Sequence, residues 1–278
     1  MYAAPDGGAR PLVVYVHGGA WRSENKEQHA ALAVRIRELT GCGVAVLDYR
    51  LTVRASLPLP PPRRHDADAD GGPQTEENGL KHPGHARDVL DALRFLTAWP
   101  DGAPFDATRL YLVGHSAGAH MLTSLLLDAA ASLTPLPADT DYLRPDGAVL
   151  RAVRGVALAS GIYDVARLVA AFPAYERQFV RQAFRAPYAC WDTTRYPLHA
   201  GAAALRWRVI HSAGDTAVDL GQSQAMFAHL RRLYAERGWD AERVSKDWDT
   251  LTGPHDYTHL PEFAQMIADW VTQDMQDY

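Results

Sequence analysis

The feature that most constrains the fold is a short glycine-bounded turn near the middle of the chain. An apolar run over residues 110–113 ends at Gly114, and the chain continues as His-Ser-Ala-Gly to Gly118. A segment rich in alanine and leucine follows, to about residue 131. This order predicts a strand, a very tight turn with Ser116 at its apex, and a helix. Glycine is expected at both positions because the chain passes so close to itself that a Cβ atom would clash.

Ser116 is predicted to be a nucleophile. The helix is expected to begin at about Ala117. Its first N–H groups have no partners within the helix, and they and the positive end of the helix dipole would face the group that Ser116 attacks. The five-residue pattern also occurs by chance, and a serine between glycines is commonly only a turn. The strand before Ser116 and the helix after it favour the catalytic interpretation.

Composition indicates one ordinary globular domain over residues 1–278. With 47% hydrophobic and 22% charged residues, the chain is neither disordered nor fibrous. A net charge of −5 argues against nucleic acid or an anionic membrane as the main partner. No apolar run is long enough to span a bilayer, and the first residues do not resemble a signal peptide. We therefore expect a cytoplasmic protein, with Cys42 and Cys190 as reduced thiols of the core.

Strands and helices are predicted to alternate along the chain. Short apolar runs predict buried strands, and apolar residues at every third or fourth position predict helices. Strands are expected at 11–16, 43–48, 110–113, 153–159, 207–212 and about 244–251. Helices are expected at 26–40, 85–99, 117–131, 220–237 and 261–275. The alternation predicts an α/β fold with a mostly parallel central sheet and helices on both faces.

Two segments interrupt this alternation. Residues 53–81 are rich in proline and in alternating Asp and Ala, a composition that does not bury enough apolar surface to fold alone. We expect a long surface insertion there, and favour a plain excursion over a lid above the site. Residues 165–200 are rich in aromatic side chains and arginine, and are expected to form a helical, cap-like excursion above the sheet.

An acid and a base that would serve Ser116 follow later strands. Functional groups in such sheets gather at the carboxyl ends of the strands. Asp215 and His255 both occupy such positions, and the order Ser, Asp, His suits an α/β-hydrolase arrangement, in which His takes the serine proton and the acid orients the imidazole. Asp219 and His259 are the alternatives; Asp219 is better explained as the start of the next helix.

Donors for a developing oxyanion are expected at two places. His17-Gly18-Gly19 follows the first strand and offers bare backbone N–H groups, and the amide of Ala117 offers another. A Gly-Gly pair is often only a flexible turn, but its combination with the serine turn favours the functional interpretation. His17 itself is expected to hold the loop in shape rather than to move protons.

Several motifs carry a family resemblance. After three of the predicted strands stand His17-Gly-Gly-Ala-Trp21, Asp48-Tyr-Arg-Leu51 and Gly114-His-Ser-Ala-Gly118. Together they resemble the His-Gly-Gly esterase branch of the α/β-hydrolases, and within it the kynurenine formamidases, particularly the fungal type. Further matching segments are Ser160-Gly-Ile-Tyr-Asp164, Phe172-Pro-Ala-Tyr-Glu176, His211-Ser-Ala-Gly-Asp215 and Pro254-His255. The resemblance runs from about residue 11 to 271, and the 53–81 insertion departs from it.

The resemblance implies hydrolysis of N-formyl-L-kynurenine to L-kynurenine and formate, in tryptophan catabolism. Trp21, Tyr163 and Tyr175 would supply an aromatic wall for the small-molecule substrate, although any of them could instead belong to the core. A short-chain carboxylesterase of broad specificity is the alternative activity, and a catalytically inactive binding protein the alternative class. No metal or organic cofactor is implied, since no ligand cluster or phosphate-binding loop is recognisable. A homodimer is compatible with the sequence, which does not fix the oligomeric state.

Overall fold

The computed structural model describes residues 1–5, 9–52, 79–100, 102–131 and 143–276. Most of the insertion expected at 53–81 therefore lies outside the described residues, and only residues 79–81 of it are placed. The side chain of Lys81 donates to the carbonyls of Arg181 and Gln182. The N–H of His82 donates to the carbonyl of Ala183. Hydrogen bonds thus attach the chain that follows the insertion to the helical segment near residue 182.

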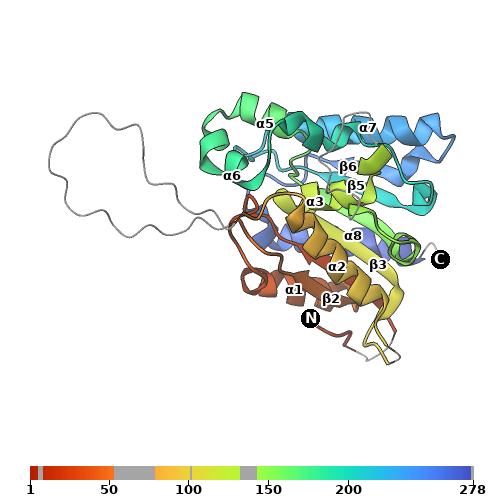
Figure 1. The fold of residues 1–278 in the computed structure, drawn as a ribbon. Helices are drawn as coiled ribbons and strands as arrows, with labels where there is room; N and C mark the ends of the chain where they lie inside the picture. Colours follow the sequence, from red (N-terminus) through yellow and green to blue (C-terminus); the bar gives the residue numbers. More distant parts are fainter. Residues whose placement is uncertain (6–8, 53–78, 101, 132–142, 277–278) are drawn as a thin grey trace, which may run out of the picture.

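Within the described residues the sheet has six strands, all parallel, in the order β2-β1-β3-β4-β5-β6. The strands are β1 (Pro11–Val16), β2 (Gly43–Leu47), β3 (Asp106–His115), β4 (Val153–Ala159), β5 (Arg206–Ile210) and β6 (Val244–Asp247). The predicted α/β-hydrolase-type sheet with helices on both faces is confirmed (Figure 1). Because every strand points the same way, all six carboxyl ends lie at one edge of the sheet.

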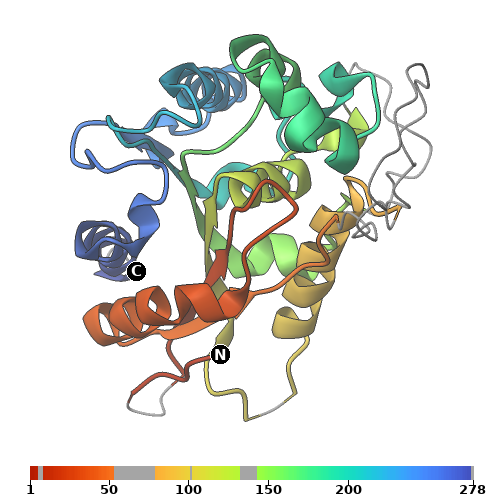
Figure 2. The ribbon, with the colours of Figure 1, turned by 90° about the vertical axis from the view of Figure 1, so that its left-hand side faces the viewer.

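Two hydrophobic cores separate the sheet from its two helix layers. Along β1, Leu12, Val14 and Val16 belong to one core, whereas Val13 and Tyr15 belong to the other. This alternation follows from the two-residue repeat of a strand. The first core is covered by α2 (Gly84–Thr97), α3 (Ala117–Leu126), α4 (Gly147–Ala152) and α7 (Leu220–Glu236). The second core is covered by α1 (Ala30–Thr40) and α8 (Pro261–Gln276), which lie side by side in Figure 2.

Residues 165–200 are largely helical, as predicted. They contain α5 (Val165–Ala171), a π-helical turn η4 (Glu176–Val180) and α6 (Arg181–Ala183). The described residues also include short 3₁₀ turns: η1 (Lys26–His29), η2 (Ala129–Ala131), η5 (Tyr188–Trp191), η6 (Thr193–Arg195), η7 (Ala202–Ala204), η8 (Ala241–Arg243) and η9 (Tyr257–His259).

Among the element ends that differ from the sequence expectation, two have a clear local cause. The helix after Ser116 ends at Leu126 rather than near residue 131, because Leu127 is extended and pairs with Leu198 in an antiparallel bridge. Strand β6 ends at Asp247 rather than near residue 251, because the Asp247 carboxylate accepts the N–H of Thr250 and turns the chain. Neither difference moves the segments that carry the candidate site.

The two cysteines are free and buried, as expected for core thiols. Among the residues that the structure describes, none of the helices combines the length and apolar character needed to cross a membrane.

Candidate active site

The turn at Ser116 is strained, and two neighbouring glycines make it sterically feasible. Ser116 has φ 52° and ψ −116°, in the left-handed region that L-residues rarely adopt. A Cβ added at Gly118 would lie 2.1 Å from the carbonyl oxygen of Val16, and one at Gly114 would lie 2.8 Å from the backbone of Ala119. Helix α3 begins at the next residue, Ala117, so the predicted strand, tight turn and helix are confirmed.

Asp215 and His255 are joined by a short hydrogen bond. His255 Nδ1 lies 2.7 Å from Asp215 Oδ2, while Asp215 Oδ1 accepts the N–H groups of Ala217 and Val218 at 2.9 and 3.0 Å. Burial alone would raise the pKa of Asp215. The hydrogen bond and charge of His255, together with the Val218 N–H and the Ser160 hydroxyl, outweigh burial and lower that pKa to about 2. Asp215 is therefore an ionised, fully hydrogen-bonded acceptor near neutral pH.

His255 lies against the residue that precedes Ser116. The ring of His115 lies 4.7 Å from that of His255, centroid to centroid, and His115 Nε2 is 3.0 Å from the His255 carbonyl oxygen. Burial, and then repulsion by His255, lower the pKa of His115 to about 3, so its imidazole is neutral and donates from Nε2. This contact brings the His255 loop, which follows β6, to the Ser116 turn, which follows β3.

The glycine loop after β1 lies directly against Ser116. A Cβ added at Gly18 would lie 3.1 Å from the Ser116 Cβ. The Tyr49 hydroxyl donates to the carbonyls of His17 and Gly18 on the other side of the loop. Because the N–H and C=O of a trans peptide point in opposite directions, the N–H groups of Gly18 and Gly19 point away from Tyr49. Gly19 itself has φ 81°.

His17 is held inside this loop rather than presented at the site. Its Nδ1 lies 3.2 Å from the Gly18 carbonyl oxygen and its ring stacks on Tyr49 at 4.5 Å. Its Nε2 lies 3.8 Å from an Asp48 carboxylate oxygen. Burial lowers the pKa of His17, so the ring is neutral near pH 7. These contacts fit a residue that fixes the shape of the loop.

The alternative acid and base are placed elsewhere. Asp219 stands at the N-cap position of α7, and its carboxylate lies 3.5 Å from the guanidinium of Arg167. His259 belongs to η9 and stacks on His29 at 5.6 Å. The structure therefore brings together Asp215 and His255, and not Asp219 and His259.

Two of the three residues expected to form an aromatic wall belong to the core. Trp21 and Tyr163 have no exposed surface. The indole of Trp21 packs edge-on against Phe184, with ring centroids 4.6 Å apart. Tyr175 is only partly buried, and its hydroxyl donates to the carbonyl of Ala217 at 3.2 Å, close in sequence to Asp215. For Trp21 and Tyr163 the core interpretation is the one that fits the structure, because both side chains are fully buried in the first hydrophobic core.

Sequence reasoning missed two hydroxyl groups beside the acid. The Tyr257 hydroxyl donates to Ser160 Oγ at 3.0 Å, and the Ser160 hydroxyl is among the groups that lower the pKa of Asp215. The available signal was the position of Ser160 directly after a predicted strand, the same kind of position that singled out Ser116.

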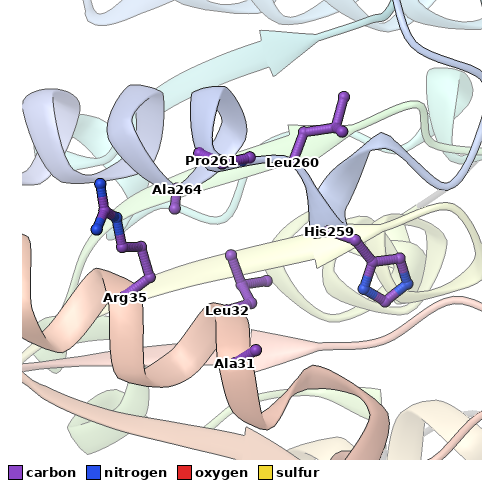
Figure 3. Close-up of a pocket in the computed structure, with 7 residues that line it drawn as sticks. All are labelled: Ala31, Leu32, Arg35, His259, Leu260, Pro261 and Ala264. Atoms are coloured by element: carbon purple, nitrogen blue, oxygen red, sulfur yellow. The ribbon is translucent and has the colours of Figure 1, made fainter.

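A separate groove of about 350 Å³ lies between α1 and the start of α8 (Figure 3). Ala31, Leu32 and Arg35 line it from α1, and His259, Leu260, Pro261 and Ala264 line it from the other side. It contains none of Ser116, Asp215 or His255. Within the described part of the chain, no three His, Cys, Asp or Glu side chains are grouped so as to hold a metal ion.

Comparison with known proteins gives the family context. No family model matches the chain. The kynurenine formamidase of Eremothecium gossypii is 29% identical over 226 residues, which cover 78% of each protein. The kynurenine formamidase of Scheffersomyces stipitis is 23% identical over 282 residues, covering 95% of this chain and 90% of the relative.

Among solved structures, a hyperthermophilic esterase from Pyrobaculum calidifontis superposes with a TM-score of 0.63 at 20% identity. The superposition covers 97% of this chain and 79% of the esterase, and it shows a shared fold. Sequence and fold agree: the chain has the fold of this esterase and is similar in sequence to kynurenine formamidases, and both likenesses indicate a hydrolase.

Proposed function

We propose that this chain is a serine hydrolase that cleaves N-formyl-L-kynurenine to L-kynurenine and formate. The substrate comes from the curated relatives, which are kynurenine formamidases. The observation that carries the mechanism is the 2.7 Å hydrogen bond between Asp215 and His255. The loop that contains His255 also contacts His115, the residue directly before Ser116. An acid, an imidazole and a hydroxyl in this order are the parts of a nucleophilic triad.

The first half of the reaction forms a formyl-enzyme. His255 donates from Nδ1 to Asp215, which leaves the lone pair on Nε2 to accept the Ser116 proton as Oγ attacks the formyl carbon. The N–H groups of Gly18, Gly19 and Ala117 stabilise the oxyanion that develops. Loss of one such donor typically lowers turnover about 10²- to 10³-fold.

The C–N bond then breaks as protonated His255 gives its proton to the departing aryl amine. L-Kynurenine leaves, and the formyl group remains on Ser116 as an ester. In the second half, His255 takes a proton from water, the resulting hydroxide equivalent attacks the ester carbon, and formate is released as the proton returns to Ser116 Oγ. Asp215 stays ionised throughout because its pKa is about 2, and it orients the imidazole.

The chemistry of the substrate suits these parts. Formyl is the smallest acyl group, so the acyl side needs little room beside Gly18. An aryl amine is weakly basic and benefits from general-acid assistance as it leaves. Hydrolysis of an ester would use the same catalytic residues. The alternative function, a short-chain carboxylesterase, therefore differs in substrate and not in mechanism.

The decisive experiment compares two substrates under one set of conditions. Turnover of N-formyl-L-kynurenine, followed by formate and by kynurenine absorbance, is measured beside turnover of p-nitrophenyl acetate. We expect a kcat/KM at least about tenfold higher for the formamide, a difference of about 1.4 kcal/mol in transition-state free energy. Rapid ester turnover without formate release would refute the proposed substrate. Formamide turnover that persists undiminished in Ser116→Ala would refute the mechanism.

A further inference from the structure

The pairing of β5 with β6 continues into the two loops that carry the proposed acid and base. The acid loop (residues 211–219) follows β5, and the base loop (residues 248–256) follows β6. Beyond the last paired residues of the strands, the N–H of Ala213 donates to the carbonyl of Leu251 at 2.8 Å. The two loops therefore leave the sheet side by side, joined by backbone hydrogen bonding.

Ser212 bonds to both loops. Its hydroxyl lies 2.5 Å from the carbonyl oxygen of Gly253 in the base loop, and its own carbonyl accepts the N–H of Asp215 at 3.1 Å. A carbonyl oxygen only accepts, so the hydroxyl is the donor of the first bond. Ser212 is 1% exposed, so water does not compete for this bond. The side chain holds the base loop, while the backbone of the same residue holds the turn that leads to the acid.

The two loops also meet backbone to backbone at Gly214. A Cβ added at this position would lie 2.2 Å from the carbonyl oxygen of Thr252 and 2.8 Å from that of Gly253. A side chain here would therefore push the base loop away from the acid loop. The absence of a side chain at Gly214 and the hydroxyl of Ser212 together set the spacing of the two loops.

The bond to Gly253 constrains His255 through Pro254, the residue between them. The proline ring fixes the φ angle, so fewer backbone rotations separate the Gly253 carbonyl from His255 than in an ordinary segment. The carbonyl of His255 itself accepts from His115 Nε2 at 3.0 Å. The base loop is thus held at two carbonyls, by Ser212 after β5 and by His115 at the end of β3.

We propose that Ser212 is a positioning residue of the reaction, its hydroxyl joining the base loop to the acid loop so that Asp215 and His255 keep the geometry of their 2.7 Å hydrogen bond. The inference rests on the function proposed above, since it takes these two residues as acid and base. Without the hydroxyl, the base loop is free to shift relative to the acid loop. The imidazole would then be oriented correctly less often, and small misplacements slow a reaction strongly.

The first test compares leaving groups. Cleavage of N-formyl-L-kynurenine or of ethyl acetate uses His255 as base and then as acid, because an amine or alkoxide leaves poorly without a proton. The p-nitrophenolate of p-nitrophenyl acetate leaves without one. In Ser212→Ala we expect kcat/KM to fall about tenfold for the first two substrates and about threefold for the third. A smaller fraction of folded enzyme would instead lower all three values by one factor.

Two further variants frame this result, with circular dichroism to confirm that each is folded. Gly214→Ala separates the loops by packing and keeps the Ser212 hydroxyl, so it should change the ratio of the rates in the same direction. Ser245→Ala is the matched control, because the Ser245 hydroxyl also joins β6 to β5, donating to the carbonyl of Trp207 at 3.3 Å, within the sheet. Its kcat/KM should stay within about twofold of wild type for every substrate.

A second measurement does not depend on turnover. The proton that His255 donates from Nδ1 to the Asp215 carboxylate should give a downfield ¹H NMR resonance, identified by its loss in His255→Ala. In Ser212→Ala we expect this resonance to move upfield and to exchange faster with water, because the pair is held less firmly. In Ser245→Ala it should stay at its wild-type position.

Three outcomes would overturn the proposal. One is a wild-type resonance and wild-type rate ratios in both Ser212→Ala and Gly214→Ala. The second is an equal loss for all three substrates in Ser212→Ala, and the third is the same change in Ser245→Ala.

Failure of the proposed function gives a different result. No formate release from N-formyl-L-kynurenine by the wild type would remove the proposed substrate, and the two acetate esters would still test Ser212. Undiminished turnover in Ser116→Ala would remove the mechanism, and the NMR resonance would still report whether Ser212 holds Asp215 and His255 together.

Discussion

The turns at Ser116 and Ser160 are two copies of one backbone arrangement with different surroundings. They follow adjacent strands, β3 and β4, which pair in register up to their last residues. Both serines have left-handed φ angles, 52° and 42°. The N–H of each donates at 2.9 Å to the last residue of the next strand, Ala159 for Ser116 and Ile210 for Ser160.

The surroundings of the two hydroxyls differ. Ser116 lies against bare Gly18, with the N-terminus of a helix directly after it and the His255 loop beside it. Ser160 is fully enclosed, and Tyr257 donates to its hydroxyl. Backbone strain after a parallel strand therefore does not by itself identify a nucleophile. The neighbours of the hydroxyl separate a candidate that attacks a substrate from one that is enclosed in the core.

The largest expected effect separates the two serines directly. Ser116→Ala should lower kcat/KM for N-formyl-L-kynurenine by about 10⁴- to 10⁶-fold, because the attacking atom is lost. The matched change Ser160→Ala should cost only about tenfold, because it leaves the nucleophile in place. The measurement is kcat/KM for both variants, with circular dichroism to confirm folding. Equal losses in the two variants would contradict the division of roles.

The next effect concerns the acid. Asp215→Asn should lower kcat about 10⁴-fold near pH 7, because an amide that donates to Nδ1 holds the imidazole in the wrong tautomer. Asp219→Asn is the control, since Asp219 stands at the N-cap position of α7 and pairs with Arg167. Its turnover should remain within a few fold of wild type. A larger loss in Asp219→Asn than in Asp215→Asn would mean that the acid is assigned wrongly.

A glycine within two positions of each serine gives a smaller contrast. At Gly118 an added Cβ would meet the Val16 carbonyl oxygen at 2.1 Å, and this backbone atom belongs to a central strand. Gly118→Ala should displace the turn and lower kcat by about 10²-fold or more. At Gly161 the added Cβ would meet the buried ring of Tyr163 at 2.3 Å. Gly161→Ala should lower the unfolding free energy by about 1–3 kcal/mol, with less loss of turnover. Turnover and urea unfolding of both variants measure the contrast.

The smallest predicted effect is a pH dependence of stability in the Ser116 turn. Burial lowers the pKa of His115 to about 3, whereas an unfolded histidine takes its proton near pH 6.5. Between these values the unfolded state binds the extra proton, so stability is full above about pH 6.5 and declines as the pH falls toward 3. When the pH is lowered from 7 to 4.5, His115 should therefore reduce the free energy of unfolding by about 2 kcal/mol.

The check is urea unfolding of wild type and His115→Gln at both pH values. The other buried histidines are present in both proteins, so the difference between the two pH dependences isolates His115. The variant should lose less stability on acidification. An equal loss would show that the buried imidazole takes up its proton in the folded state.

Much of this arrangement could be predicted because it is local in sequence or follows from a parallel sheet. The Ser116 turn is encoded by five neighbouring residues, and the positions of Asp215 and His255 follow from the common edge at which parallel strands end. The contact between Ser160 and Tyr257 could not be predicted, because it joins residues 97 positions apart and depends on how two loops pack.

The side chains that line the site were the least predictable part. Trp21 and Tyr163 are aromatic residues in motifs near the site, yet both are covered by neighbouring side chains. Residue type alone does not distinguish a buried ring from one that faces a substrate, because large aromatic side chains serve in both roles.

The central claim is that His255 activates the Ser116 hydroxyl, and covalent labelling tests it most directly. The protein is treated with phenylmethanesulfonyl fluoride, digested, and mapped by mass spectrometry, beside His255→Ala. The account predicts a single sulfonyl adduct on the peptide that contains Ser116, formed at least about 10²-fold more slowly in His255→Ala. An adduct on a different residue, or equal labelling rates in the two proteins, would contradict it.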